Sequence, residues 1–270
     1  MPSRPTKHNW RLTMEPVKPR TRGPILGAQI DAITWHATLA RIASWAKQRE
    51  SRYVCLCNVH SVVTASLDPE FRDVINGADL ATPDGMPVAW ALARLGFSRQ
   101  PRINGPDLMW RLCESSVRSE TKLFFYGSST QTLAQLESKL NTAFPRIRIV
   151  GLVSPPYRTL SAEENNAMVN QINISGAQLV FVGLGCPKQE LWMAAQRGRI
   201  HAVMLGVGAA FDYHAGTLKR APMWMQRTGL EWLYRFGQEP RRLWRRYLVT
   251  NLIFVMGMAR QLLTRHDRST

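Results

Sequence analysis

The sequence predicts an α/β fold, a parallel sheet flanked by helices, followed by a basic, amphipathic helical appendage at the C-terminal end. Two observations predict the sheet: short apolar runs alternate with segments of helical spacing, and glycines directly follow several of these runs. The appendage is predicted because arginines alternate with Trp, Tyr and Leu near the end of the chain. With 270 residues, 45% of them hydrophobic, the chain can fill a core.

Charge divides the chain into three parts. Residues 1–24 carry a net charge of +5, five prolines and no periodicity, so we expect a disordered basic arm. Residues 25–218, the expected α/β core, hold only +3 of the total of +16, and residues 219–270, the appendage, hold +8. The excess requires an anionic partner: nucleic acid, a membrane surface or a phosphorylated substrate.

The first predicted strand of the core is Tyr53–Asn58. Cys55 and Cys57 alternate within it, so the pleat should point both thiols to one face of the sheet. A zinc site would need a second pair of ligands, which the sequence lacks, and buried, reduced cysteines favour the cytosol. No signal peptide is visible at the start of the chain.

The alternation continues to residue 205. Strands are predicted at Lys122–Tyr126, Arg146–Val150, Gln178–Val182 and Ala202–Leu205, and helices at Thr130–Ala143, from the Ser161–Glu164 capping box to about Ile172, and at Lys188–Arg197. In a parallel sheet the ligand lies beyond the carboxyl ends of the strands. The residues that directly follow each strand are therefore the candidates for a site, with Asn58 and Gly127 among them.

A glycine-rich turn connects one of these strands to the next helix. Gly183 and Gly185 would let the backbone approach a phosphate at a helix N-terminus, or they serve a tight turn that needs glycine for its geometry. Gln189 and Glu190 follow in the first helical turn. The segment matches neither a Walker A loop nor GxGxxG, so it indicates a phosphate-bearing ligand without naming one.

Two loops carry acidic and basic side chains. Asp84 lies between Pro83 and Gly85, where an aspartate is either a turn former or a carboxylate held rigidly as a general base. Arg102 and Asn104 belong to a second loop, in which Asp107 is expected near a helix N-cap. Arg102 could pair with a phosphate or a carboxylate, or be solvated.

The segment Gly206–Gly216 repeats the glycine pattern after the last strand. Asp212 and His214 lie two residues apart in what reads as a loop, which does not establish an acid/base pair. A lone histidine beside Tyr and Phe is more often structural.

The appendage has a basic part and an apolar part. Arg235, Arg242 and Arg245 could together bind a diphosphate, or form a solvated basic face. Tyr247–Met258 is strongly apolar, but at about a dozen residues it is shorter than the ~20 of a membrane-spanning helix. The residues alone leave two alternatives: a helix in the membrane interface or one packed on the core.

Seven motifs, read in order, resemble one family. They are N-x-x-S from Asn58, ADLATPDGMPVAW (78–90), RINGPDL (102–108), LFFYGSS (123–129), VGLGCPKQE (182–190), GVGAAFDYHAG (206–216) and GLEWLYRFGQEPRRLWRRY (229–247). Over roughly residues 25–250 the chain resembles glycosyltransferase family 26, the WecG/TagA/CpsF group. One departure is Leu56, where relatives often have threonine.

The resemblance implies a Rossmann-like core and an inverting glycosyltransferase. The enzyme would move N-acetylmannosamine, or a related hexose or uronic acid, from a UDP-sugar to a polyprenyl-diphosphate-linked saccharide. This would occur at the cytoplasmic face of the inner membrane, by a peripheral enzyme, in bacterial surface polysaccharide or exopolysaccharide synthesis. It implies no cofactor and no metal, and it leaves a homo-oligomer open.

The resemblance also implies roles for individual residues. Asp84 matches the proposed catalytic base. Arg235, Arg242 and Arg245 would stabilise the departing UDP diphosphate, and Gln189 would contact the donor. From their places after strands and in loops, we expect the donor or its diphosphate also to be bound by Asn58, Gly85, Arg102, Asn104, Gly127 and Gly185. A lipid acceptor favours interfacial docking of the appendage, with its basic residues attracted to anionic lipid.

Two other classes of protein make different predictions. A nicotinamide-dependent oxidoreductase would have GxGxxG after the first strand, and Asn58-Val-His-Ser lacks it. A non-enzymatic protein that binds nucleic acid or membrane through its charge would show salt-sensitive DNA binding that Asp84→Ala leaves intact. No helix-turn-helix or RNP signature is present, so we expect no nucleic-acid partner.

Overall fold

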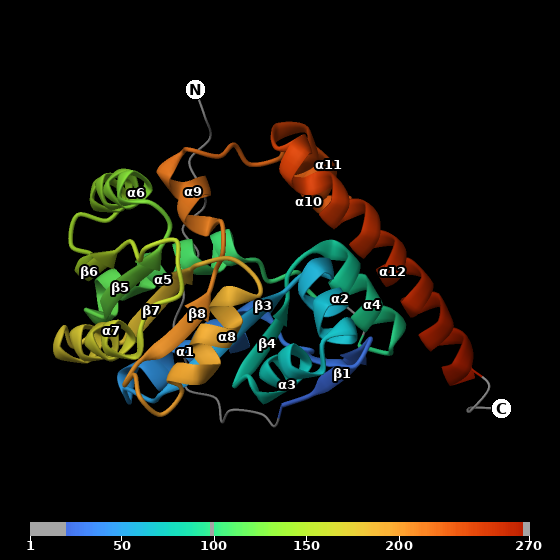
Figure 1. Ribbon diagram of the computed structural model, residues 1–270, viewed down its shortest axis with the longest axis horizontal. Coiled ribbons are helices and arrows are strands. Elements are labelled where there is room, and N and C mark those ends of the chain that lie inside the picture. Colours follow the sequence, from blue (N-terminus) through green and yellow to red (C-terminus); the bar gives the residue numbers. More distant parts are fainter. Residues whose placement is uncertain (1–19, 98–99, 267–270) are drawn as a thin grey trace.

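A computed structural model describes residues 20–97 and 100–266, with the side chains of residues 242, 245, 246, 265 and 266 left out. Its centre is a six-stranded, all-parallel sheet in the order β4-β3-β8-β7-β5-β6 (Figure 1). The strands are β3 (Arg52–Cys57), β4 (Leu80–Pro83), β5 (Lys122–Gly127), β6 (Arg148–Val153), β7 (Leu179–Gly183) and β8 (Val203–Gly206). The predicted parallel sheet is confirmed.

Helices cover both faces of the sheet. One face packs against α2 (Val59–Leu67), α3 (Pro69–Gly77), α4 (Met86–Arg94), α7 (Ala162–Ile174) and α8 (Lys188–Gln196). The other packs against α1 (Trp35–Lys47), α5 (Gly105–Ser119), α6 (Thr130–Ala143) and α9 (Ala210–Ala215). Cys55 and Cys57 both point to the first face, and Val54 and Leu56 to the second, as the pleat predicts. Burial raises the pKa of both thiols well above the ordinary value.

The predicted strands and helices between residues 122 and 206 agree with the structure to within three residues. The Ser161–Glu164 capping box is present, with both reciprocal hydrogen bonds formed. Strand β4 was not predicted from the sequence, because the segment Thr82-Pro83-Asp84-Gly85 resembles a turn. The sequence analysis also read α9 as a loop: Asp212 and His214 lie on this short helix.

The N-terminal boundary differs from the expectation. Most of the expected arm, residues 1–19, lies outside the described residues, but Arg22–Ile25 forms β1, which pairs antiparallel with β2 (Ala28–Asp31). Arg20 donates two hydrogen bonds to the carboxylate of the buried Asp31, at 2.8 and 2.6 Å. Assigning residues 20–24 to a disordered arm was therefore wrong.

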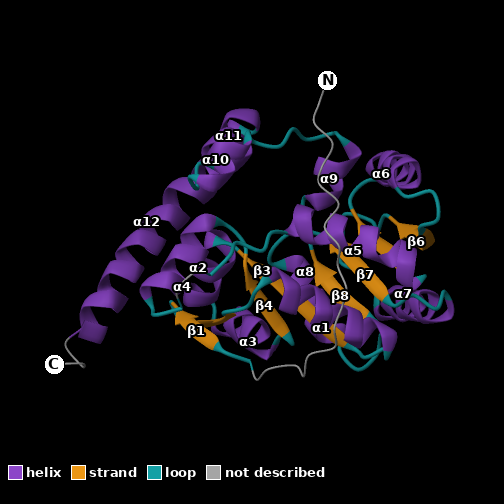
Figure 2. Cartoon of the chain, turned by 180° about the vertical axis from the view of Figure 1, so that it is seen from behind, coloured by secondary structure: helices purple, strands orange, loops and turns teal. Residues whose placement is uncertain are grey.

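The C-terminal segment contains α10 (Met223–Arg227), α11 (Glu231–Gln238) and the long α12 (Pro240–His266), which runs along one flank of the body (Figures 1 and 2). Phe254 and Met258 join the core cluster, and α12 packs against α2 and α11. Gln261 ties the helix to the β1–β2 turn: it accepts from the Leu26 N–H at 2.9 Å and donates to the Pro24 carbonyl at 2.6 Å.

The apolar stretch is longer than the sequence analysis stated, because it continues within one 27-residue helix. By length and composition Tyr247–Thr264 could cross a membrane, with a mean hydropathy of 1.2. The prediction that this stretch is too short to span a membrane is therefore wrong. One face of α12 nevertheless lies against the protein, whereas Trp244, Leu248, Leu252 and Met256 are exposed on its other face. The helix is apolar on both faces over this stretch.

Candidate active site

A cavity of about 840 Å³ lies beyond the carboxyl ends of β3, β4 and β8. The turns that follow these strands form one wall, and α4, α11 and α12 contribute the others. Its volume is in the range of small-molecule sites, and its position is where ligands bind in open α/β sheets. Eight of the predicted site residues line it: Asn58, Asp84, Gly85, Arg102, Asn104, Gly185, Gln189 and Arg235.

Asp84 follows β4 directly and is held by its backbone, since its N–H donates to the Cys57 carbonyl at 2.9 Å. Gly85 comes next with φ of 98°, a conformation that favours glycine, and α4 begins one residue later. Burial raises the pKa of the Asp84 carboxyl to about 7, although Arg102 and Arg235 oppose the shift. A carboxyl with a pKa near neutrality is suited to accept a proton from a bound hydroxyl.

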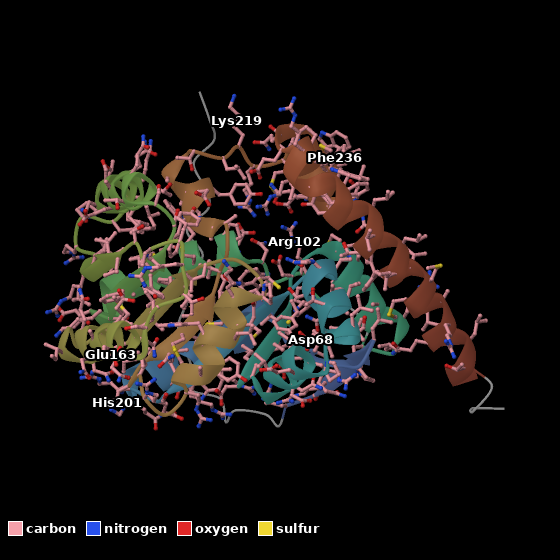
Figure 3. The ribbon with its side chains drawn as sticks, in the orientation of Figure 1. Asp68, Arg102, Glu163, His201, Lys219 and Phe236 are labelled. Carbon is pink, nitrogen blue, oxygen red and sulfur yellow. The ribbon has the colours of Figure 1, made fainter. Side chains whose placement is uncertain are left out.

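Arg102 attaches the C-terminal segment to the rim of the cavity. Its Nη2 lies 2.5 Å from a carboxylate oxygen of Glu231 on α11, and Nη1 donates to the Gln226 carbonyl of α10 at 3.4 Å. Figure 3 shows the Arg102 side chain between the α/β body and α10–α11. Of the alternatives left open by the sequence, the structure shows pairing with a carboxylate.

Arg235 reaches the cavity from α11. Its guanidinium lies 5.9 Å from the centre of the Tyr213 ring, and its Nε is 3.9 Å from the Glu239 carboxylate. The Nε atoms of Arg102 and Arg235 are buried and have no hydrogen-bond partner among the described residues. Buried N–H groups in such a position are suited to bind an anionic ligand. The side chains of Arg242 and Arg245, predicted to act with Arg235, lie outside the described ones.

Gln189 holds two glycine turns together. Its Oε1 accepts from the N–H groups of Gly185 and Gly208 at 3.2 and 3.1 Å, and its Nε2 donates to the Gly206 carbonyl at 3.1 Å. Nε2 also donates to the buried Glu190 carboxylate at 2.8 Å. These four bonds use the full capacity of the amide, and they occupy the Gly185 N–H. In this structure Gln189 therefore positions the two turns, and its contact with the donor, which the resemblance implies, stays a prediction.

The two predicted asparagines both cap helices at the cavity. The Asn58 Oδ1 accepts from the Ser61 N–H at 3.2 Å at the start of α2. Asn104 caps α5 by accepting from the Asp107 N–H at 2.9 Å, and it donates to the Asp107 carboxylate at 2.6 Å. Arg220 completes this cluster with a 2.6 Å ion pair to Asp107. Leu56 is buried in β3 and lines the cavity.

Gly127 is not among the residues that line the cavity. It ends β5, and a Cβ added there would lie 2.5 Å from the backbone of Gly183 on β7. Its φ of 125° also favours glycine. The sequence placed Gly127 at the site because it follows a strand, but the structure requires glycine there for the close approach of two strands.

His214 has a structural role, as the residues around it suggested. Its Nε2 lies 2.8 Å from the Pro106 carbonyl, and its ring stacks on Trp110 at a centroid distance of 5.0 Å. Burial lowers its pKa, so the neutral ring that donates to this carbonyl is favoured. Burial raises the pKa of Asp212, which accepts weak 3.5 Å hydrogen bonds from Ser128 and Thr217.

Sequence reasoning missed Glu231, Tyr213 and Trp90, which also line the cavity. All three lie inside motifs that carried the resemblance, and the signal that could have found Glu231 is that it is one of three acids among the eleven Lys and Arg of residues 219–270. Among the described residues, no group of three or more His, Cys, Asp or Glu side chains is arranged to hold a metal ion.

Comparisons with known proteins identify the family of this chain. Residues 24–268 match the model of the glycosyl transferase WecG/TagA/CpsF family. The chain is also 31% identical over 206 residues to the N-acetylglucosaminyldiphosphoundecaprenol N-acetyl-beta-D-mannosaminyltransferase of Bacillus spizizenii (strain ATCC 23059 / NRRL B-14472 / W23). This match covers 76% of the chain and 78% of the relative. The chain belongs to the WecG/TagA/CpsF family and is a glycosyltransferase.

Proposed function

We propose that this enzyme transfers a hexose-type sugar, N-acetylmannosamine or a related one, from a UDP-sugar to a polyprenyl-diphosphate-linked saccharide. The Bacillus relative is named for the transfer of N-acetyl-beta-D-mannosamine to N-acetylglucosaminyl diphosphoundecaprenol. The observation that carries the proposal for this chain is one carboxyl with a pKa of about 7 in the same cavity as two arginines. The product would enter a bacterial surface polysaccharide or exopolysaccharide.

In the proposed mechanism, Asp84 accepts the proton of an acceptor hydroxyl as that oxygen attacks C1 of the donor sugar. The bond between C1 and the UDP oxygen breaks, and UDP leaves with the electron pair. A single displacement of this kind inverts the configuration at C1. One carboxylate is sufficient for it, since no covalent sugar intermediate is formed.

The arginines supply positive charge for the leaving group. Arg235 reaches the cavity with a buried Nε that has no hydrogen-bond partner among the described residues, and guanidinium groups bind diphosphate oxygens in a bidentate manner. Arg242 and Arg245 follow on α12 and would add to this charge. We propose that they perform the neutralisation without a metal ion, so turnover should persist in EDTA.

We also propose that the enzyme binds peripherally to the cytoplasmic face of the membrane. Met223, Trp224, Trp244, Leu248, Leu252 and Met256 give the C-terminal segment an exposed apolar surface, which we call the outer face. Apolar side chains flanked by arginines suit the interface of an anionic bilayer. The triple substitution Leu248→Gln, Leu252→Gln and Met256→Gln should reduce sedimentation with anionic vesicles while leaving thermal stability unchanged. Undiminished sedimentation would contradict the assignment.

A donor screen tests the proposed function. The detergent-solubilised protein is incubated with a synthetic prenyl-diphosphate N-acetylglucosamine acceptor, a panel of UDP-sugars and EDTA, and UDP release is measured. If UDP is released with one UDP-sugar only, and only when the acceptor is present, the proposal is supported and the sugar is identified. The Asp84→Asn variant serves as the inactive control. Salt-sensitive DNA binding without UDP release, and without UDP binding by calorimetry, would favour the non-enzymatic alternative instead.

A further inference from the structure

The cavity has two unlike ends. The end nearest the sheet contains Asp84, Arg102, Glu231 and Arg235. The other end lies between α4 and α12 and is mainly apolar. A ligand that occupies the whole cavity must therefore be charged or polar at one end and hydrocarbon at the other.

Each of the two helices presents one face to the apolar end. Pro87, Trp90, Ala91 and Arg94 follow helical spacing on α4. Along α12 the lining residues are Tyr247, Thr250, Asn251, Phe254, Val255, Met258 and Leu262. From the first to the last of these positions the helix rises about 22 Å. We call this region, between the two faces, the α4–α12 groove.

Packing of the C-terminal segment keeps the groove open beside α4. Helix α12 packs against α2 and α11, where Phe254 and Met258 are buried. Gly229, which precedes α11, leaves room for the Trp90 ring, since a Cβ there would lie 2.9 Å from that ring. Trp90 is thus held between the α10–α11 turn and the groove, at the junction of the polar and apolar ends.

We propose that the α4–α12 groove binds the first isoprenoid units of the acceptor while its sugar hydroxyl lies at Asp84. This inference rests on the proposed function and adds where the lipid chain runs. In such an acceptor the sugar, diphosphate and hydrocarbon follow one another, and the cavity changes from charged to apolar in the same order. The outer face of α12 is exposed along the same helix, so the rest of the chain would continue directly into the bilayer.

The donor fits the groove less well. A nucleoside diphosphate is polar along its length. In an apolar groove it would lose its hydrogen bonds to water, and the groove would not replace them. Arg102, Arg235 and the glycine turns, which suit a nucleoside diphosphate, lie at the sheet end. The two substrates would therefore approach Asp84 from different sides.

Chain-length dependence in solution tests the inference. N-Acetylglucosaminyl diphosphate is prepared as its ethyl and its farnesyl ester, and kcat/KM is measured for both without vesicles or detergent, so that membrane partitioning plays no part. We expect the farnesyl ester to be preferred at least about tenfold, because the groove removes apolar surface from water. Ala91→Phe, which fills the groove, should bring this ratio close to one without lowering kcat/KM for the ethyl ester.

Matched variants control for misfolding. Ala93→Phe places the same bulk on the exposed side of α4 and should keep the wild-type ratio. If Ala91→Phe does not fold, a second pair of variants on α12 replaces it: Val255→Gln on the groove rim and Ala259→Gln one turn further along. Val255→Gln should lower the ratio of kcat/KM for the farnesyl ester to that for the ethyl ester, and Ala259→Gln should leave it unchanged. Equal kcat/KM for both esters, or a ratio that neither groove variant changes, would overturn the assignment and leave the proposed function intact. No turnover of either ester would overturn both.

Discussion

Two aspartates at opposite ends of β4 show how differently the two edges of the sheet treat a carboxylate. Asp79, at the amino end, is buried and accepts from Arg52 and Arg197 at 2.8 Å each and from the Tyr53 N–H at 3.0 Å. Asp84, at the carboxyl end, has a raised pKa, and no hydrogen bond to its carboxylate is formed by the described residues. At the amino edge of the sheet, the carboxylate of Asp79 is bound by groups of the protein itself. At the carboxyl edge, the carboxylate of Asp84 remains able to form hydrogen bonds with a ligand.

The largest expected effect is on turnover. Asp84→Asn keeps the shape of the side chain but removes the proposed base, so kcat should fall by about 10²–10⁴-fold. Calorimetry should show that the variant still binds UDP, because the arginines are unchanged. If Asp84→Asn had a kcat near that of the wild type, Asp84 would not be the catalytic base, and the proposed difference between Asp84 and Asp79 would be wrong.

The second effect is on stability at the amino edge. Asp79→Asn would leave Arg52 and Arg197 without their carboxylate, so the free energy of unfolding should fall by about 2–4 kcal/mol. Because both arginines are partly exposed, we expect the lower half of this range. Urea unfolding measures the loss, and kcat of the folded variant should stay close to that of the wild type. If Asp79→Asn were as stable as the wild type but had a low kcat, Asp79 would serve turnover and not stability, which is the opposite of what we expect.

Asp84→Asn should have the opposite effect on stability. Because the pKa of Asp84 is raised from its ordinary value of 3.8 to about 7, the folded wild type holds a proton that the unfolded chain releases between these values. The stability of the wild type therefore falls relative to the variant as the pH rises from 4 to 7. Above pH 7 the variant should be more stable by about 1–2 kcal/mol, and below pH 4 the two should be equal. Unfolding at pH 4 and pH 8 checks the sign.

The smallest effect is on the pH profile. Activity of the free enzyme, as kcat/KM, should rise with pH through about 7 as Asp84 loses its proton. Arg102 and Arg235 lower the pKa of Asp84, whereas Glu231 and Asp107 raise it. Glu231→Gln should move the midpoint down and Arg102→Gln should move it up, each by less than one pH unit. Shifts of the same sign would show that the Arg102–Glu231 pair does not tune the base.

Much of the fold could be predicted from the sequence, since β3, β5, β7 and β8 are apolar runs bounded by glycine or polar residues. Strand β4 could not, because its four residues end in Pro83 and its burial depends on β3 beside it. The length of α12 was also hidden, since the arginines at its start interrupt the apolar pattern.

The candidate site also contains residues that could be predicted from the sequence and residues whose roles could not. Asp84, Arg102 and Arg235 could be located by motif and by the rule that ligands bind at the carboxyl ends of strands. The roles of Gln189 and Gly127 could not, because each depends on contacts with residues of another strand or turn. Glu231 forms an ion pair with Arg102, and this pairing is apparent only in the structure, where α11 lies beside the Arg102 loop.

The two hydrogen bonds of Gln261 connect distant parts of the chain mechanically. Helix α12 cannot swing outward without releasing the Leu26 amide and the Pro24 carbonyl. The hairpin that carries these groups ends at Asp31, whose carboxylate accepts from the Ala81 N–H of β4 at 2.7 Å. A short series of bonds therefore runs from α12 through the hairpin to the strand that precedes Asp84. A force that pulls α12 away from the body would reach the base through the backbone, and drift of α12 in a detergent micelle would lower activity without altering the cavity's own residues.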